Sequence, residues 1–367
     1  NQLVLWTCEA LRRHADGRNR HRHMGGSLSA LRPLGLYLLA ALCVTWPGFP
    51  SLNTALIGRM GGDNYEHVWY LWWLAHTLFE NIGSPVHIPL LNYPVGVYSP
   101  LNLTHTPALF LPAMLGYLTT PVSAYNLAMM LVPALNASGM YWLAIELTAS
   151  RRAALLGGLL FGFSPHMLGH MQAGHLSLIT MLGFPLFTLF LLRLIRRPTW
   201  QRTAATGLSA FLAAAHPSYL AYFILPTALI TLGSSRSRLR NRQVCAAVLT
   251  AALLAIAMLA PFYVPLLTSH EAITTRSLEL GDSVGKSIDI ASLLTPPSDN
   301  PFLPAALQPF AARVVTSTDE NHGYLGWVAL GLAVLGVVTR RRAIAHWTAL
   351  AGGTLLLSLG PVLKFAG

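Results

Sequence analysis

Long apolar segments separated by short polar ones run along most of this chain. Several approach the roughly 20 residues that an α-helix needs to cross the hydrocarbon core of a bilayer. Because a chain in lipid must satisfy its backbone polar groups internally, the pattern predicts an all-α polytopic membrane protein. The apolar segments lie at 33–52, 103–118, 122–147, 153–168, 175–195, 203–216, 218–233, 243–267, 324–339 and 344–361.

The predicted topology depends on the short segment 103–118, which contains Pro107 and Pro112 and is followed almost at once by the longer 122–147. If 103–118 stays in the membrane interface, all the basic clusters fall on one side. The positive-inside rule makes that side the cytoplasm. We therefore predict about nine transmembrane helices, with the N-terminus inside. We predict one membrane domain at 32–367, which includes two long outer loops at 53–121 and 268–323.

The composition agrees with this topology. Charged residues make up 10% of the chain and hydrophobic residues 53%, whereas an ordinary soluble domain is roughly 25% charged. On the predicted topology, 19 of the 24 Lys and Arg residues are cytoplasmic and 10 of the 13 Asp and Glu residues are outside. The bilayer, rather than nucleic acid, therefore explains the formal charge of +11. Three cysteines, without metal-ligand spacing, predict no disulfide framework.

Residues 1–31 are rich in Arg and His and lack the apolar core of a signal peptide, so we expect a cytoplasmic basic leader, with Met24 as an alternative start. The chain begins with Asn1 and ends at Gly367, just after an apolar segment. We therefore expect it to be part of a longer protein that continues at the C-terminal end.

The first outer loop contains an aromatic segment, 65–81, with apolar residues at helical spacing. Trp69, Trp72 and Trp73 suit the headgroup level, where a ring is half apolar and half wet. The segment therefore predicts a helix that lies in the membrane interface.

Asp63 and Glu66 stand at the start of this predicted helix and allow two interpretations. They can form a capping box, with Asp63 at the N-cap and Glu66 three residues later, which requires no chemistry. Alternatively, Gly61 and Gly62 let the backbone approach another segment closely, and a carboxylate at the membrane surface serves as a general base. Asp63 is the leading catalytic candidate, Glu66 is the second, and capping is compatible with either.

The order of these features resembles a known group of enzymes. A first helix leads outward to the acidic motif and the aromatic helix, a His105-Thr106-Pro107 sequence precedes a short apolar helix, and a spanning helix ends in Ser150-Arg151-Arg152-Ala153-Ala154. This arrangement resembles the GT-C superfamily of membrane glycosyltransferases over about residues 30–200. It is most similar to the family 39, dolichyl-phosphate-mannose mannosyltransferase-like bacterial proteins and their YfhO-type relatives.

The resemblance implies an inverting transfer from a polyprenyl-phosphate-sugar donor to a glycan, lipid or protein acceptor at the outer face of the cell membrane. Asp63 matches the family's first carboxylate, but the usual adjacent Asp-Glu is here Asp63-Asn64, with Glu66 two places later. The family often has an acidic residue at the outer start of the helix near 175, where this chain has His175. A divalent metal ion is compatible with the reaction but not required, because phosphate is already a competent leaving group.

Further candidates for donor or acceptor binding lie in the predicted outer loops. Arg276 or Lys286 would neutralise a lipid phosphate, and the three histidines near 170 would bind a phosphate or a sugar hydroxyl. Loose spacing argues against a metal site there, and ordinary interfacial histidines are an alternative. The predicted substrate-binding residues are Tyr93, His105, His166, His170, His175, Arg276, Lys286, Glu320, His322 and Tyr324.

Two other functions fit the pattern of apolar segments. A transporter or flippase for a lipid-linked or polar solute would need ionisable residues along its path, and the spanning segments contain few. Inverted repeats, common in transporters, are not evident in the sequence. A noncatalytic membrane scaffold is the third interpretation, and it predicts that Asp63 can be replaced without effect.

Overall fold

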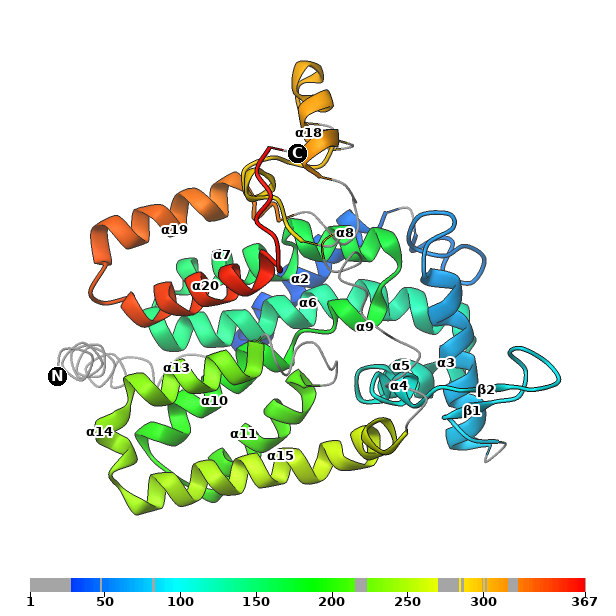
Figure 1. The fold of residues 1–367 in the computed structure, drawn as a ribbon, viewed down its shortest axis with the longest axis horizontal. Coiled ribbons are helices and arrows are strands. Elements are labelled where there is room, and N and C mark those ends of the chain that lie inside the picture. Colours follow the sequence, from blue (N-terminus) through cyan, green and yellow to red (C-terminus); the bar gives the residue numbers. More distant parts are fainter. Residues whose placement is uncertain are drawn as a thin grey trace.

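The computed structural model describes residues 28–46, 48–80, 83–214, 223–269, 284, 287–298, 300, 302–315 and 323–366, and these are mostly helical (Figure 1). The predicted leader lies outside the described residues up to position 27, and a helix begins at Leu28. The all-α fold predicted from the sequence is confirmed, with one small addition. A two-stranded antiparallel hairpin pairs β1 (His87–Ile88) with β2 (Val97–Tyr98).

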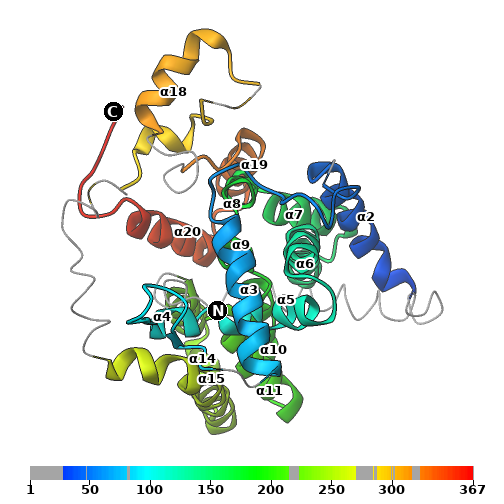
Figure 2. The same cartoon turned by 90° about the vertical axis from the view of Figure 1, so that its right-hand side faces the viewer.

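One set of helices forms a bundle, and the other elements lie around it (Figures 1 and 2). The bundle consists of α2 (Leu28–Val44), α6 (Pro121–Thr148), α7 (Arg151–Gly162), α10 (Gly183–Arg196), α11 (Trp200–Ala213), α13 (Leu225–Ser234), α15 (Arg242–Thr268), α19 (Trp327–Arg340) and α20 (Ala345–Ser358). The elements around it are α3 (Asn64–Phe79), α4 (Pro100–Leu103), α5 (Thr106–Leu118), α8 (Pro165–Ala173), α9 (Leu176–Ile179), α14 (Arg236–Leu239), η2 (Ile290–Leu293), η3 (Ala305–Leu307) and α18 (Gln308–Val314).

Three helical stretches among the described residues are long and apolar enough to cross a membrane, by length and composition. They are Pro121–Thr148, Leu176–Arg196 and Arg242–Thr268. The sequence predicted about nine. The other apolar helices are shorter: α19 and α20 have 14 residues each, or about 21 Å at 1.5 Å per residue, against a hydrocarbon core of roughly 30 Å. The described structure therefore supports membrane character with fewer helices of spanning length.

Local sequence explains why one apolar segment does not form a single helix. The segment 153–168 is divided between α7 and α8 because the Ser164 hydroxyl accepts a hydrogen bond from the Met167 amide and Pro165 occupies the first turn of α8. Serine at the N-cap followed by proline is a strong helix start. The prediction of one continuous span there is wrong.

The segment predicted as an interfacial helix forms α3, which lies across the end of the bundle (Figures 1 and 2). Trp69 and Trp73 stack with ring centroids 6.1 Å apart. Trp73 is buried in the core, so the predicted half-wet headgroup position is wrong for this residue. The segment with Pro107 and Pro112 forms α5, a helix of 13 residues. Its length is compatible with the interfacial position that the predicted topology assigns to this segment.

The loop between α2 and α3 is held by a buried asparagine of α6. The Asn126 amide donates to the carbonyl oxygens of Leu52 and Ala55, at 2.8 and 2.7 Å, and its own oxygen accepts from the Ile57 amide at 2.9 Å. Asn126 is fully buried. These bonds satisfy three backbone groups of an irregular segment and fix the path of the chain toward Asp63.

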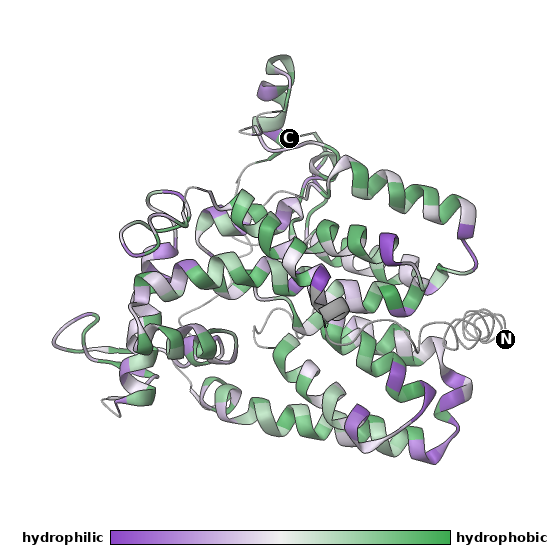
Figure 3. Cartoon of the chain, turned by 180° about the vertical axis from the view of Figure 1, so that it is seen from behind, coloured by the Kyte–Doolittle hydropathy of each residue, from purple (hydrophilic) through white to green (hydrophobic). Residues whose placement is uncertain are grey.

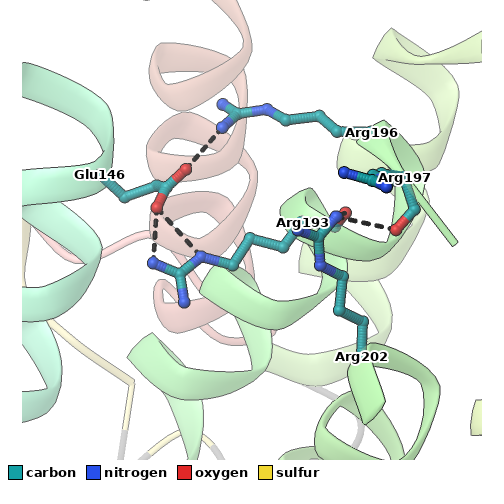
Figure 4. A network of polar contacts seen from close by, with 5 residues as sticks. All are labelled: Glu146, Arg193, Arg196, Arg197 and Arg202. Carbon is teal, nitrogen blue, oxygen red and sulfur yellow. Dashed lines mark hydrogen bonds and ion pairs between the residues drawn. The ribbon is translucent and has the colours of Figure 1, made fainter. Parts of the chain in front are cut away.

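Basic residues gather at the opposite end of the bundle from α3. Glu146 near the end of α6 accepts two hydrogen bonds from Arg193 and one from Arg196, at 3.0, 2.6 and 2.7 Å (Figure 4). The Arg202 guanidinium donates to the carbonyls of Arg193 and Arg197. Hydrophilic residues mark this end in Figure 3, whereas the helices between the two ends are mostly hydrophobic.

Candidate functional site

Asp63 lies where the loop before α3 meets the end of α8. The Asp63 amide donates to the Ala173 carbonyl at 2.9 Å, and the Arg59 amide donates to the Gln172 carbonyl at 2.7 Å. Two segments far apart in sequence are thus joined through their backbones. This contact brings the start of α3 to the turn between α8 and α9.

Glycines permit this close approach. A Cβ at Gly62 would lie 2.6 Å from the Ala173 carbonyl oxygen, and one at Gly174, where φ is +88°, would collide with the backbone nitrogen of Asn64. Gly61 has open space around it. The predicted close approach is therefore confirmed for Gly62, and Gly174 provides the opposing half of the contact.

The carboxylate of Asp63 does not cap α3. Asp63 occupies the N-cap position, but its side chain makes no capping hydrogen bond. The backbone amide that a capping box would pair with Glu66 donates to Ala173 instead. The capping-box interpretation is wrong, and Glu66 is exposed at the surface.

Asp63 instead contacts a buried histidine. Its Oδ2 lies 3.0 Å from Nε2 of His175, and the two side chains are 54% and 8% exposed, respectively. Within the described residues, Oδ1 has no hydrogen-bond partner. One carboxylate oxygen is therefore held from the protein side, while the other is open to a molecule outside.

The three histidines predicted to cluster form a line behind this carboxylate. His175 Nδ1 lies 2.7 Å from His170 Nδ1, and the ring of His166 meets that of His170 edge-on at 4.3 Å between centroids. His170 and His175 are buried, whereas His166 is exposed. The line thus runs from a surface carboxylate through two buried imidazoles to a surface imidazole.

A fourth histidine, His67, belongs to the same group and was missed by the sequence analysis. Its Nδ1 lies 3.0 Å from the Asp63 carbonyl oxygen, and its Nε2 accepts from the Ser177 amide at 3.4 Å. Burial lowers the pKa of His67 from its ordinary value of 6.5, more than the Asp63 carbonyl and the nearby carboxylates raise it. Its position one helical turn after Asp63 is the signal that could have identified it.

The remaining predicted residues are less closely connected to Asp63. Tyr93 is 84% exposed in the β1–β2 connection. The His105 carbonyl accepts the first hydrogen bonds of α5. Tyr324 packs edge-on against Trp327 with ring centroids 6.1 Å apart. It lies two residues before Gly326, where a Cβ would be 3.8 Å from Pro165 at the start of α8. The predicted residues Arg276, Lys286, Glu320 and His322 lie outside the described residues.

The described part of the chain contains no group of three or more His, Cys, Asp or Glu side chains placed to hold a metal ion. Comparisons with protein-family models, curated proteins and solved structures found no match to this chain. The chemical features on which a function can be argued are therefore those of the Asp63 group itself. A half-exposed carboxylate held by a buried imidazole is able to accept a proton from a hydroxyl that reaches Oδ1.

Proposed function

We propose that this chain is an inverting membrane glycosyltransferase of the GT-C type, which moves a sugar from a polyprenyl-phosphate donor to an acceptor hydroxyl. The observation that carries the proposal is the contact of Asp63 Oδ2 with His175, in a carboxylate side chain that stays 54% exposed. The first outer loop also resembles that of the GT-C enzymes, and this resemblance suggests a reaction that needs such a carboxylate.

The proposed reaction takes place at the outer face of the cytoplasmic membrane. The basic end of the bundle, with Arg193 and Arg196, would lie in the cytoplasm by the positive-inside rule. Asp63 precedes α3, which lies at the opposite end (Figure 1). The proposed arrangement keeps about nine membrane-crossing helices, with local thinning of the bilayer around the shorter apolar ones.

In the proposed mechanism, Asp63 removes the proton from the acceptor hydroxyl as its oxygen attacks the anomeric carbon of the donor. The bond from this carbon to the phosphate oxygen breaks, its electron pair leaves with polyprenyl phosphate, and the configuration inverts. The abstracted proton ends on Oδ1. Because the Asp63 side chain is 54% exposed, the proton can then return to water directly.

The decisive test replaces Asp63 by Asn, which keeps the size of the side chain and removes its basicity. Removal of a general base typically costs about 10²- to 10⁴-fold in rate, so we expect a loss in this range. The assay measures release of polyprenyl phosphate from a panel of polyprenyl-phosphate sugars in membranes that contain the native acceptors. Glu80→Gln is the matched control, because Glu80 is a carboxylate of the same loop that pairs with His76. Full activity of Asp63→Asn would refute the proposal.

A transporter or flippase is the second candidate, and one observation favours it. The spanning stretch Leu176–Arg196 is interrupted between α9 and α10, and interrupted helices line the binding sites of many transporters. The charges within the described spanning stretches nevertheless lie at their basic ends, where Glu146 is paired with arginines. Substrate uptake into proteoliposomes without sugar transfer would favour the transporter.

A further inference from the structure

The contacts among Asp63, His175 and His170 determine where the protons lie. An ionised carboxylate only accepts hydrogen bonds, so Nε2 of His175 must carry the hydrogen that points at Oδ2. In the neutral ring, Nδ1 of His175 is then an acceptor. For a neutral His175, the 2.7 Å contact between the two Nδ1 atoms places the donated hydrogen on Nδ1 of His170.

We infer that His170 and His175 are positioning residues for Asp63, an inference that rests on the proposed function. His175 holds Oδ2 with a neutral N–H donor, so that Oδ1 faces the acceptor. His170 fixes the tautomer of His175, since the nitrogen that carries the proton in a histidine is set by the partner of the other nitrogen. Both rings are buried, at 6% and 7% exposure.

Loss of His170 would act through His175. Without a donor at Nδ1, the proton of His175 can move to that nitrogen, and Nε2 then turns a lone pair toward the Asp63 carboxylate. The carboxylate loses its support and rotates. Removing the partner that orients an active group commonly costs about 10- to 100-fold, and we expect this loss in kcat, with KM little changed, because neither imidazole contacts the substrate.

Four other titratable groups lie near the contacts among Asp63, His175 and His170. His166 stands edge-on to His170, and His67 binds the Asp63 carbonyl and Ser177. Glu66 lies near His67, and Tyr125 donates its hydroxyl hydrogen to the Ile57 carbonyl. None of these bonds engages Nδ1 of His175, so among the described residues His170 is the partner of that nitrogen, as Asp63 is of the other.

The first experiment detects the hydrogen bond without any substrate. In the full chain labelled with ¹⁵N at histidine, the Nδ1–H···Nδ1 bond should give a scalar coupling between two imidazole nitrogens. The coupled pair should disappear in His170→Gln and in His175→Gln. It should persist in His87→Gln, which replaces an exposed histidine of β1. Absence of a coupled pair from the unsubstituted protein would overturn the inference.

The second experiment separates this inference from the proposed function. His170→Leu removes the donor and should lower kcat by 10- to 100-fold, whereas His170→Gln keeps an amide donor and should recover part of that loss. If Asp63→Asn is inactive while His170→Leu has the unsubstituted kcat, the positioning role is wrong and the proposed function stands. If Asp63→Asn is fully active, the proposed function itself fails.

Discussion

His67 lies between Asp63 and Ser177. Its Nδ1 is 3.0 Å from the carbonyl oxygen of Asp63 and so carries the hydrogen. Its Nε2 accepts from the Ser177 amide at 3.4 Å, which a neutral ring allows, and lies 3.3 Å from the Ser177 hydroxyl oxygen. This geometry agrees in direction with the burial that lowers the pKa of His67.

Acidification should therefore weaken the fold through His67. Its pKa is lowered on folding, so below the ordinary value of 6.5 the unfolded chain binds a proton that the folded chain does not. The stability that neutral His67 contributes to the fold is fully present above pH 6.5 and is lost as the pH falls below this value. We expect the midpoint temperature of thermal unfolding in detergent to fall more between pH 7.5 and pH 5 in the unsubstituted protein than in His67→Gln. Equal shifts in the two proteins would contradict this assignment.

The sequence identifies most members of the candidate site but not their connections. Asp63 and His175 can each be singled out by residue type and by their place in predicted outer loops. Their contact depends on the backbone pairing at Ala173, which only the folded chain brings about. The capping-box prediction fails for the same reason, because a tertiary partner takes the amide that a local motif would use. For His67, the spacing of one helical turn after Asp63 is the only local signal, and its contact with Ser177 depends on the folded chain.

At the scale of elements, hydropathy predicts where apolar helices occur but not where they break. The segment 175–195 is continuously apolar, yet the helix is interrupted at Thr180 to Leu182 between α9 and α10. Asn136, fully buried in α6, compensates for the interruption. Its amide donates to the Ile179 carbonyl at 2.7 Å, and its oxygen accepts from the Met181 amide at 3.1 Å. By contrast, the break after α7 could have been predicted, because Ser164 and Pro165 mark a helix start.

Replacing Asn136 by Leu should destabilise the protein strongly. The change leaves a carbonyl and an amide unsatisfied in an apolar interior, and each such group costs about 1–3 kcal/mol. We expect a loss of roughly 2–6 kcal/mol in the free energy of unfolding, measured by reversible denaturation in mixed micelles. Ser138→Ala is the control on the same helix, since the Ser138 hydroxyl bonds only the Ala134 carbonyl of its own helix. If both variants lose the same small amount, Asn136 does not stabilise the break.

At the scale of the whole molecule, charge separates the two ends of the bundle. Glu146 is 20% exposed and balances Arg193 and Arg196, while Arg238 donates to the Arg196 carbonyl at 3.3 Å, so the ends of α6, α10 and α14 are joined. The α19–α20 connection, with Arg340 at its start, lies at the same end in Figure 1. Short loops rich in arginine are retained in the cytoplasm during membrane insertion. The orientation of the bundle is therefore a prediction that follows from the position of these arginines.

Cysteine labelling tests this orientation directly. In a variant with Cys8, Cys43 and Cys245 replaced by Ser, single cysteines would be placed at Tyr93, in the β1–β2 connection, and at Arg240, just after α14. Both native side chains are exposed, so neither substitution disturbs the interior. In intact cells, a membrane-impermeant maleimide should label Tyr93→Cys. It should label Arg240→Cys only after the cells are lysed.

The pattern of labelling bears on the candidate site as well as on the orientation. Asp63 can meet a polyprenyl-phosphate sugar at the outer face only if the α3 end of the bundle is outside. The reverse labelling pattern would therefore place the Asp63 group in the cytoplasm, and it would exclude the proposed location of the reaction. Labelling of both positions without lysis would mean that the two ends do not lie on opposite sides of the membrane. Efficient labelling of both after lysis is the control that each cysteine is reactive, because an unreactive cysteine would otherwise imitate protection by the membrane.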